Sequence, residues 1–340
     1  MDLTFSPEQE SIREAVRSVL ADRIPAPRAR AELAPDPGLW REAATLGWFG
    51  LGLPEAVGGA GYGLPEETIL FVELGRSLAA GPWLGTVLAT HALAAVPALR
   101  EDLAKAVGGG TRVAVVDDPA DELGDATRPS GTVRGVADGD VADVFLVLGG
   151  RRVRWVLARG GGVRVAVRES LDPTRRVADV SFADAAAELL GAEASSLRRT
   201  ALVLVAAEAL GIAERTLEAS VVHAKTREQF GRPIGSFQAV KHRCADMAVR
   251  TEVARSIVTF AAVALRDLEP GAPRHAQQAK VLATSAALAN GHDNVQNHGG
   301  MGFTWEADAH LFLKRAWLLE HAFGTRTAHL EALAAPWRAG

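Results

Sequence analysis

The second half of the chain is dominated by long amphipathic stretches, and this feature limits the possible fold more than any other. Apolar residues recur there at helical spacing. The stretches are Ala194–Lys225, Phe237–Leu268, Arg274–His298 and Glu306–Leu333. Long helices joined by short connections usually pack antiparallel as a bundle. We therefore predict a four-helix bundle over residues 194–340.

The first 110 residues predict a separate helical domain. Ser6–Gln9 is a helix start signal, with a capping hydroxyl followed by proline and acidic residues. Further helical patterns cover Pro37–Gly47, Pro65–Leu78 and Trp83–Val107. The run Gly58–Gly63 predicts a loop between two of these helices.

Residues 111–190 have a different residue pattern, in which short runs of β-favouring residues alternate with turn residues. The runs are Val113–Val116, Val144–Val147, Val153–Leu157 and Val163–Val167. We expect a small, mostly antiparallel β domain here. The sequence thus predicts an α+β protein, mainly α, with domains at residues 1–110, 111–190 and 194–340.

Composition excludes several classes of protein. The chain has 37 basic and 41 acidic residues that are spread out, so no nucleic-acid footprint is predicted. A lone cysteine, Cys244, excludes an intrachain disulfide and fits a reducing cytoplasm. Residues 1–8 lack the pattern of a signal peptide. The apolar run Ala201–Ile212 carries Glu208 and is shorter than the roughly 20 residues that a membrane helix needs. We expect a cytoplasmic protein.

The segment Thr226–Gln238 interrupts two long helices with a Gly/Pro turn that carries arginine and glutamine. A planar guanidinium presented in this way can bind phosphate oxygens bidentately. Spacing alone favours the plainer interpretation, which is a solvated loop between helices.

A second candidate segment, Gln296–Glu306, is rich in glycine. Glycines let a ligand approach the backbone closely, and exposed N–H groups can hold an anion. The segment follows a helix rather than a strand, so it is not a Rossmann fingerprint, and Gly58–Gly63 fails for the same reason. His298 lies within the segment and is expected to brace the loop. The other histidines form no ligand-like cluster, so no metal site is predicted.

Taken together, the two segments resemble the C-terminal domain of acyl-CoA dehydrogenases. Stretches resembling the N-terminal domain of that family are Leu46–Trp48, Leu53–Glu55, Gly58–Gly61 and Val72–Arg76. Stretches resembling its β domain are Asp138–Asp143 and Ser170–Arg175. The resemblance covers essentially the whole chain. It implies the acyl-CoA dehydrogenase fold, with an N-terminal helical domain, a middle β domain and a C-terminal four-helix bundle.

The resemblance also implies FAD as the cofactor. In this family FAD lies across a subunit interface, with the flavin ring against the β domain of one subunit. The diphosphate and adenosine are held by the C-terminal domain of the neighbouring subunit. By motif, the cofactor-binding residues here are Arg227 for the pyrophosphate with Gln229 and Phe230 nearby, and Gln296, Gly299 and Gly300 for the ADP portion.

The catalytic base of the family is missing at its usual position. The reaction removes the proton α to a thioester while a hydride passes to the flavin, and it needs a positioned carboxylate. That glutamate usually precedes a Gly-Thr pair, but here Phe323 precedes Gly324 and Thr325. Some members place it near the start of the first bundle helix, where Arg198–Leu202 contains no carboxylate.

Two acids remain near these positions. Glu208 lies further along the first bundle helix, and Glu320 lies three residues before Phe323. Each is expected to face solvent or to pair with an arginine. Glu320 is the better candidate for a displaced base.

The motif that the family uses to contact the flavin is also incomplete in this sequence. The family β domain carries a Thr-Glu-Pro segment followed by Gly-Ser-Asp. The equivalent stretch here is Val116–Ala120, which has no hydroxyl before its acid and no Gly-Ser-Asp after it.

This pattern of loss favours one hypothesis over two others. The chain resembles the short subunits of heterotetrameric acyl-CoA dehydrogenases from bacterial steroid side-chain degradation, where a full-length homologue supplies the glutamate. We therefore expect an α2β2 assembly acting on an acyl-CoA, with a steroid side-chain ester as substrate by analogy only. The first alternative is a self-sufficient homotetramer with a displaced base, which is Glu320 or another acid. The second is a flavin-free scaffold subunit.

Overall fold

The computed structural model describes residues 3–24 and 36–338, so Met1 and Asp2 of the N-terminal stretch considered above lie outside it. The chain divides into two compact units. The helical unit contains Met1–Glu32, Thr68–Ala79 and Leu202–Gly340. The mixed unit contains Leu33–Glu67 and Ala80–Ala201.

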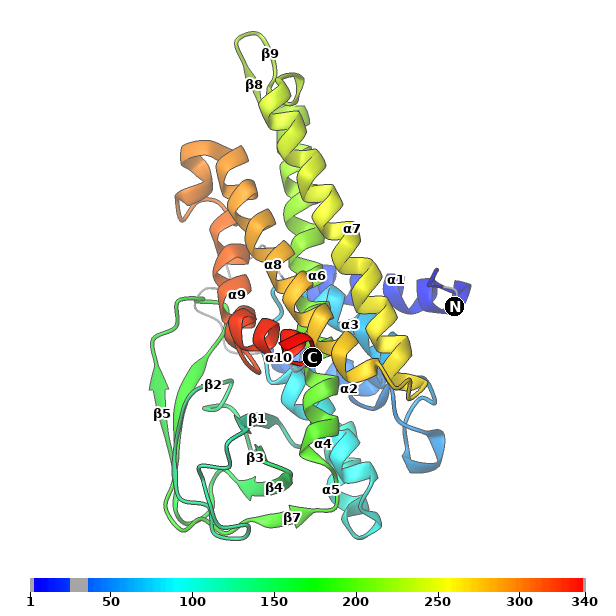
Figure 1. The fold of residues 1–340 in the computed structure, drawn as a ribbon, viewed down its shortest axis with the longest axis vertical. Coiled ribbons are helices and arrows are strands. Elements are labelled where there is room, and N and C mark those ends of the chain that lie inside the picture. The colour runs from blue at the N-terminus through cyan, green and yellow to red at the C-terminus, as the bar shows by residue number, and fades with distance from the viewer. Residues whose placement is uncertain (1–2, 25–35, 339–340) are drawn as a thin grey trace. The chain divides into compact units, whose positions relative to one another are not determined.

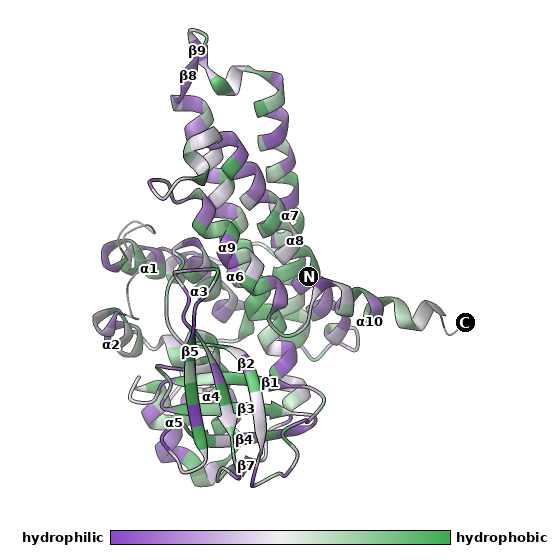
Figure 2. Cartoon of the chain, turned by 90° about the vertical axis from the view of Figure 1, so that its left-hand side faces the viewer, coloured by the Kyte–Doolittle hydropathy of each residue, from purple (hydrophilic) through white to green (hydrophobic). Residues whose placement is uncertain are grey.

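The helical unit is built around a bundle of helices that lie side by side (Figure 1). They are α6 (Ala194–Thr226, in this unit from Leu202), α7 (Gln238–Arg266), α8 (Ala272–His298) and α9 (Ala309–His321). The last helix, α10 (Arg326–Arg338), contacts α8 and projects away from the bundle axis (Figure 2). The predicted mainly helical bundle is confirmed. Residues 201–214 of α6 are all buried, which explains the apolar run there. No helix within the described residues is long and apolar enough to cross a membrane.

The predicted fourth helix is wrong as a single element. Instead, α9 ends at His321, and α10 begins at Arg326. Phe323 has φ 57° and Gly324 has φ 100°, so both are left-handed. A right-handed helix cannot continue through such residues, and a non-glycine residue adopts this conformation only where its surroundings hold it.

The N-terminal helix α1 (Pro7–Arg23) starts where the sequence predicts. The Gln9 N–H donates to Ser6 Oγ at 3.2 Å, and the Ser6 N–H donates to Gln9 Oε1 at 3.0 Å. This reciprocal pair is a capping box. The Arg17 guanidinium joins α1 to α3 (Leu64–Arg76) through Glu73, at 2.8 Å between Nη2 and Oε1.

Close approach of α3 and α6 depends on two glycines. A Cβ at Gly75 would lie 2.0 Å from the Glu208 carbonyl oxygen, and one at Gly211 would lie 2.0 Å from the Val72 carbonyl oxygen. Backbone therefore meets backbone here, and any side chain would push the helices apart. At the side of this contact, Arg76 pairs with Glu214 of α6 at 3.0 Å.

The mixed unit contains α2 (Pro37–Thr45), α4 (Trp83–Ala94) and α5 (Arg100–Val107), with short 3-10 turns at Trp48–Gly50, Glu55–Val57 and Pro97–Leu99. The predicted continuous helix Trp83–Val107 is therefore wrong. Val96 precedes Pro97 and is extended, with φ −121° and ψ 93°. The proline ring disfavours helical backbone at the residue before it, which separates α4 from α5.

Two sheets complete the mixed unit. The first has the order β1 (Val113–Asp118), β3 (Val144–Gly149), β4 (Arg152–Leu157) and β7 (Glu188–Leu190). The second has the order β2 (Gly131–Ala137), β6 (Val177–Phe182) and β5 (Val163–Arg168). Within the described sheets of this unit, β1 and β3 pair in parallel and the other neighbours pair antiparallel.

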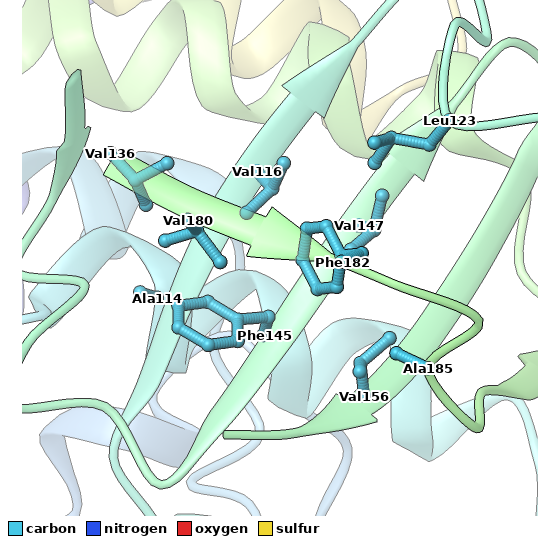
Figure 3. Close-up of a cluster of buried hydrophobic side chains, with 10 residues drawn as sticks. All are labelled: Ala114, Val116, Leu123, Val136, Phe145, Val147, Val156, Val180, Phe182 and Ala185. Carbon is cyan, nitrogen blue, oxygen red and sulfur yellow. The ribbon is translucent and has the colours of Figure 1, made fainter. Parts of the chain in front are cut away.

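The two sheets bury a shared apolar core, which Figure 3 shows. Phe145 of β3 meets Phe182 of β6 edge to face, with ring centroids 6.0 Å apart. Val116 and Val147 on the first sheet and Val180 on the second are fully buried in the same cluster. This core holds β1 in place, and the loop that follows β1 begins at the end of that strand.

Candidate cofactor site

A tight hairpin joins α6 to α7 and carries the first candidate segment. Strands β8 (Glu228–Gln229) and β9 (Arg232–Pro233) pair antiparallel, and the hairpin projects beyond the ends of these helices (Figures 1 and 2). Phe230 and Gly231 form its turn, with φ 54° and 74°. Two left-handed residues in succession are what a type I′ hairpin turn requires. The segment is therefore a defined hairpin rather than an irregular loop.

The hairpin presents its predicted site residues to solvent. Arg227, Gln229 and Phe230 are exposed, and Phe230 is 91% exposed. The Arg232 guanidinium instead lies over the Phe237 ring, 4.2 Å from its centroid. Both arginines of this segment are exposed, but the Arg232 guanidinium is held over an aromatic ring.

The second candidate segment begins at the end of α8. Gln296, Gly299 and Gly300 are exposed, and Gly299 has φ 63° and ψ −146°. A Cβ added at Gly299 or Gly300 would meet nothing within 4 Å. A Cβ at Gly302 would lie 2.5 Å from the Val295 carbonyl oxygen. Gly302 is thus a packing glycine, whereas Gly299 and Gly300 leave backbone open to a ligand.

The fold brings these two segments to the same end of the bundle. His223 of α6 stacks on His298 of α8, with ring centroids 4.2 Å apart and planes at 24°. The Arg227 N–H donates to the His223 carbonyl oxygen at 2.9 Å. His298, which was expected to brace the loop, stacks on His223. The sequence did not indicate this contact because the two residues lie 75 positions apart.

These residues fit the diphosphate part of a dinucleotide cofactor. An accessible guanidinium can bind phosphate oxygens through its planar fork. Open glycine backbone at a helix end lets an anion approach N–H groups without a side-chain clash. The six residues predicted from motifs, Arg227, Gln229, Phe230, Gln296, Gly299 and Gly300, are all accessible in the described structure. Their role toward a cofactor stays a prediction.

The position predicted for the missing base is a structured turn. The Phe323 side chain is half-buried, and its carbonyl oxygen lies 2.9 Å from His329 Nε2. The buried Lys280 ammonium donates to the Glu320 carbonyl oxygen at 2.9 Å and reaches the Gly324 carbonyl oxygen at 3.5 Å. Burial lowers the pKa of Lys280 to about 8, partly opposed by Glu320. These contacts hold the left-handed Phe323–Gly324 turn.

Both remaining acids have structural partners. Glu320 Oε1 accepts from the Arg326 N–H at 2.8 Å, and its Oε2 lies 3.0 Å from His321 Nδ1. Glu320 therefore caps the start of α10. Glu208 pairs with Arg315 at 2.9 Å, and both side chains are buried. For Glu208, the expected pairing with an arginine is confirmed. For Glu320 the expectation is wrong, because its side chain is buried and bonds a backbone N–H and His321 instead of solvent or a guanidinium.

In the mixed unit, the acids at the end of β1 are bonded to the chain itself. Asp117 Oδ1 accepts from Arg198 Nε at 2.7 Å, and Arg198 also donates to the Gly150 carbonyl oxygen at 2.6 Å. Burial raises the pKa of Asp117 although Arg198 opposes the effect. Asp118 accepts from the N–H groups of Glu122 and Leu123 at 2.8 and 3.1 Å.

The rest of this loop is closed in the same way. Asp121 pairs with Arg152 and with the fully buried Arg154, the latter at 2.7 Å. Arg154 also donates to the carbonyl oxygens of Gly124 and Ala126 at 2.8 and 3.2 Å. The loop that follows β1 is thus bonded to its own sheet, and its two hydroxyls are also bonded within this unit, Thr127 to Asp125 at 3.2 Å and Ser130 to the Asp184 N–H at 3.0 Å. These residues do not fit a flavin platform.

No cluster of three or more His, Cys, Asp or Glu side chains able to hold a metal occurs within residues 3–24 and 36–338. Cys244 of α7 is half-buried, and burial raises the pKa of its thiol. The chemistry of this site is therefore built from guanidinium, imidazole and open backbone.

Comparison with known protein families gives two matches. The acyl-CoA dehydrogenase N-terminal domain matches residues 6–101, and the acyl-CoA dehydrogenase C-terminal domain matches residues 196–336. Members of this family are FAD-dependent oxidoreductases that act on the CH–CH bond of an acyl-CoA.

Individual relatives agree over the full length. The chain is 37% identical to the acyl-CoA dehydrogenase IpdE2 of Mycobacterium tuberculosis, over 92% of each chain. It matches a chain of the ChsE4-ChsE5 complex from M. tuberculosis with a TM-score of 0.89 and 30% identity, covering 100% of both. It matches the steroid ACAD Tcur3481-Tcur3483 with a TM-score of 0.88 and 28% identity, covering 98% of this chain and 99% of the other. With the two domain matches, these likenesses place the chain in the acyl-CoA dehydrogenase family.

Proposed function

We propose that this chain is the cofactor-clamp subunit of a heteromeric acyl-CoA dehydrogenase. It binds the ADP portion of FAD, while a longer acyl-CoA dehydrogenase homologue supplies the catalytic glutamate in an α2β2 assembly. The clamp residues are Arg227, Gln229, Phe230, Gln296, Gly299 and Gly300. One contrast carries the proposal. All six proposed clamp residues are present and accessible, whereas Phe323 occupies the position where the family has its base.

The chemistry explains why a partner is needed. Bound FAD supplies an acceptor for the hydride that leaves the β carbon of the acyl group. A carboxylate must take the α proton at the same time, and the benzyl side chain of Phe323 accepts no proton. Glu208 and Glu320 are committed to Arg315 and to the cap of α10. This chain therefore contributes binding and orientation, and the proton leaves to a residue of the partner.

The relatives support both the assembly and the substrate class. ChsE4-ChsE5 is a complex of two differently named chains, and Tcur3481-Tcur3483 is a steroid ACAD that also carries two names. By analogy we propose a steroid-derived acyl-CoA as substrate, bound mainly by the partner. The loop after β1 is closed by its own ion pairs, which supports placement of the flavin ring on the partner's β domain.

Glu320→Gln tests the self-sufficient alternative. Glutamine keeps the oxygen that accepts from the Arg326 N–H, so the cap of α10 survives, but it cannot act as a base. We expect turnover of the complex to change by less than about threefold, since loss of a general base costs roughly 10²-fold or more. Steady-state kinetics with matched FAD content would show this. A folded Glu320→Gln complex with turnover reduced a hundredfold would instead make Glu320 the base.

The scaffold alternative predicts a different effect of the hairpin on FAD binding. A scaffold stabilises its partner without touching the cofactor, so its Arg227 would have no effect on FAD binding. The exposed Arg227 and the open backbone of Gly299 and Gly300 lie at the same end of the bundle, which favours the clamp. The direct test is the effect of Arg227→Ala on FAD binding by the complex.

A further inference from the structure

The end of the bundle that carries Arg227, Gly299 and Gly300 also contains two titratable side chains, His223 and His298. The proposed clamp assigns no role to either of them. His223 lies one turn before Arg227 on α6, and His298 directly precedes Gly299. The two rings stack on each other, and Arg227 is near enough to His223 to lower its pKa. One turn earlier, Ser220 Oγ donates to Asn294 Oδ1 at 2.9 Å, which keeps the two helices in register behind the rings.

The protonation state of the pair can be read from its contacts. His298 Nδ1 lies 2.8 Å from the Asn294 carbonyl oxygen, so this nitrogen carries the proton and a second proton would go to Nε2. Burial, and then the neighbouring His298 and Arg227, lower the pKa of His223. Two stacked imidazoles beside a guanidinium resist an added positive charge unless an anion is present.

Among the described residues, no carboxylate contributes to the pKa shift of His223, and Glu228 of the adjoining hairpin is exposed to solvent. On the packed helices themselves, Arg243 of α7 and Asp293 of α8 pair at 3.6 Å. Asp293 also pairs with Arg250 of α7, and Arg243 donates to Asn297 at 2.8 Å. The one carboxylate among these groups is thus shared by two arginines. A diphosphate bound beside Arg227 would supply the missing negative charge.

We propose that the His223–His298 pair is a proton-coupled part of the diphosphate site. When the diphosphate of FAD binds, one of the two rings takes up a proton from solvent. This inference rests on the proposed function, because it requires the diphosphate to lie beside Arg227. The bound anion favours the charged ring, and by linkage the charged ring strengthens binding of the anion. FAD affinity therefore increases as pH falls.

Calorimetric titration of FAD into the apo-complex of this chain with its partner tests the coupling. The FAD diphosphate is a diester that does not titrate near neutral pH, so proton uptake reports on protein groups. Titrations in two buffers of different ionisation enthalpy give the number of protons. We expect uptake of up to about one proton per FAD, and a Kd that rises by up to about tenfold per pH unit between pH 6 and pH 8.

Two variants assign the effect to the pair. His223→Phe and His298→Phe keep a flat ring for stacking but remove the titrating nitrogen. We expect each to bind FAD with proton uptake reduced by at least half and a flatter pH profile. His292→Phe, at an exposed histidine earlier on α8, is the matched control and should keep the wild-type uptake.

Two results overturn the coupling while leaving the clamp intact. The wild-type complex could bind FAD without proton uptake, or both phenylalanine variants could retain the wild-type uptake. A different result removes the clamp as well. If Arg227→Ala leaves FAD affinity unchanged, the diphosphate does not lie here, and both proposals fail.

Discussion

Arg227→Ala is expected to weaken FAD binding by the complex by about 1.5–3 kcal/mol, which is roughly 10- to 150-fold in Kd. The guanidinium is exposed at the base of the hairpin, and its loss would leave phosphate oxygens without a charged donor. Titration of FAD into the apo-complex, followed by the change in flavin fluorescence, measures the effect. Thermal stability should be nearly unchanged, because an accessible side chain contributes little to folding.

Arg232→Ala is the matched control for this experiment. Arg232 lies five residues further on in the same hairpin, but its guanidinium is stacked on Phe237. We expect its replacement to change FAD affinity by less than about threefold, since only a cation–π contact of about 1 kcal/mol is lost. Equal effects of the two variants would mean that the hairpin as a whole, rather than the Arg227 guanidinium, supports FAD binding. No effect of Arg227→Ala would favour the scaffold alternative.

Arg315→Met is expected to destabilise the helical unit by about 3–5 kcal/mol. Arg315 is fully buried and pairs with Glu208, whose side chain is 6% exposed. Removal of the cation leaves a buried carboxylate without its guanidinium partner, and such a group is costly. Urea unfolding followed by circular dichroism at neutral pH measures the loss.

The double variant Glu208→Leu/Arg315→Met separates the charge effect from packing. Removing both charges and keeping apolar volume should restore most of the stability, because the uncompensated charge is gone. The double variant should also leave turnover of the complex intact if Glu208 has no catalytic role. A single variant that loses less than about 1 kcal/mol would show that Glu208 finds another partner or water.

The spacing of apolar residues and the positions of capping and turn residues predict much of the architecture. The long helices of the bundle were predictable because their apolar residues recur with a strong helical period. The capping box at Ser6 was predictable because both of its bonds form between residues three positions apart. Strands β1, β3, β4 and β5 were predictable as short β-rich runs. The absence of the usual glutamate at Phe323 could be recognised only through the family resemblance.

What the sequence does not reveal depends on contacts between distant residues. The break between α9 and α10 rests on Lys280, which bonds to carbonyl oxygens 40 and 44 positions away. The partner of Glu208 lies 107 positions away. Strands β2 and β6 carry few consecutive apolar residues, because most of β2 is exposed and buried residues of β6 alternate with half-buried ones. The His223–His298 stack likewise has no local signal.

The most direct test of the division of labour is a comparison of two purifications. In one, this chain is expressed alone, and in the other it is expressed together with a longer acyl-CoA dehydrogenase homologue. FAD content and acyl-CoA desaturation are measured for both preparations. We predict that the chain alone retains little FAD and desaturates nothing, and that the complex contains FAD and is active. Stoichiometric FAD and desaturation by the isolated chain would contradict the account.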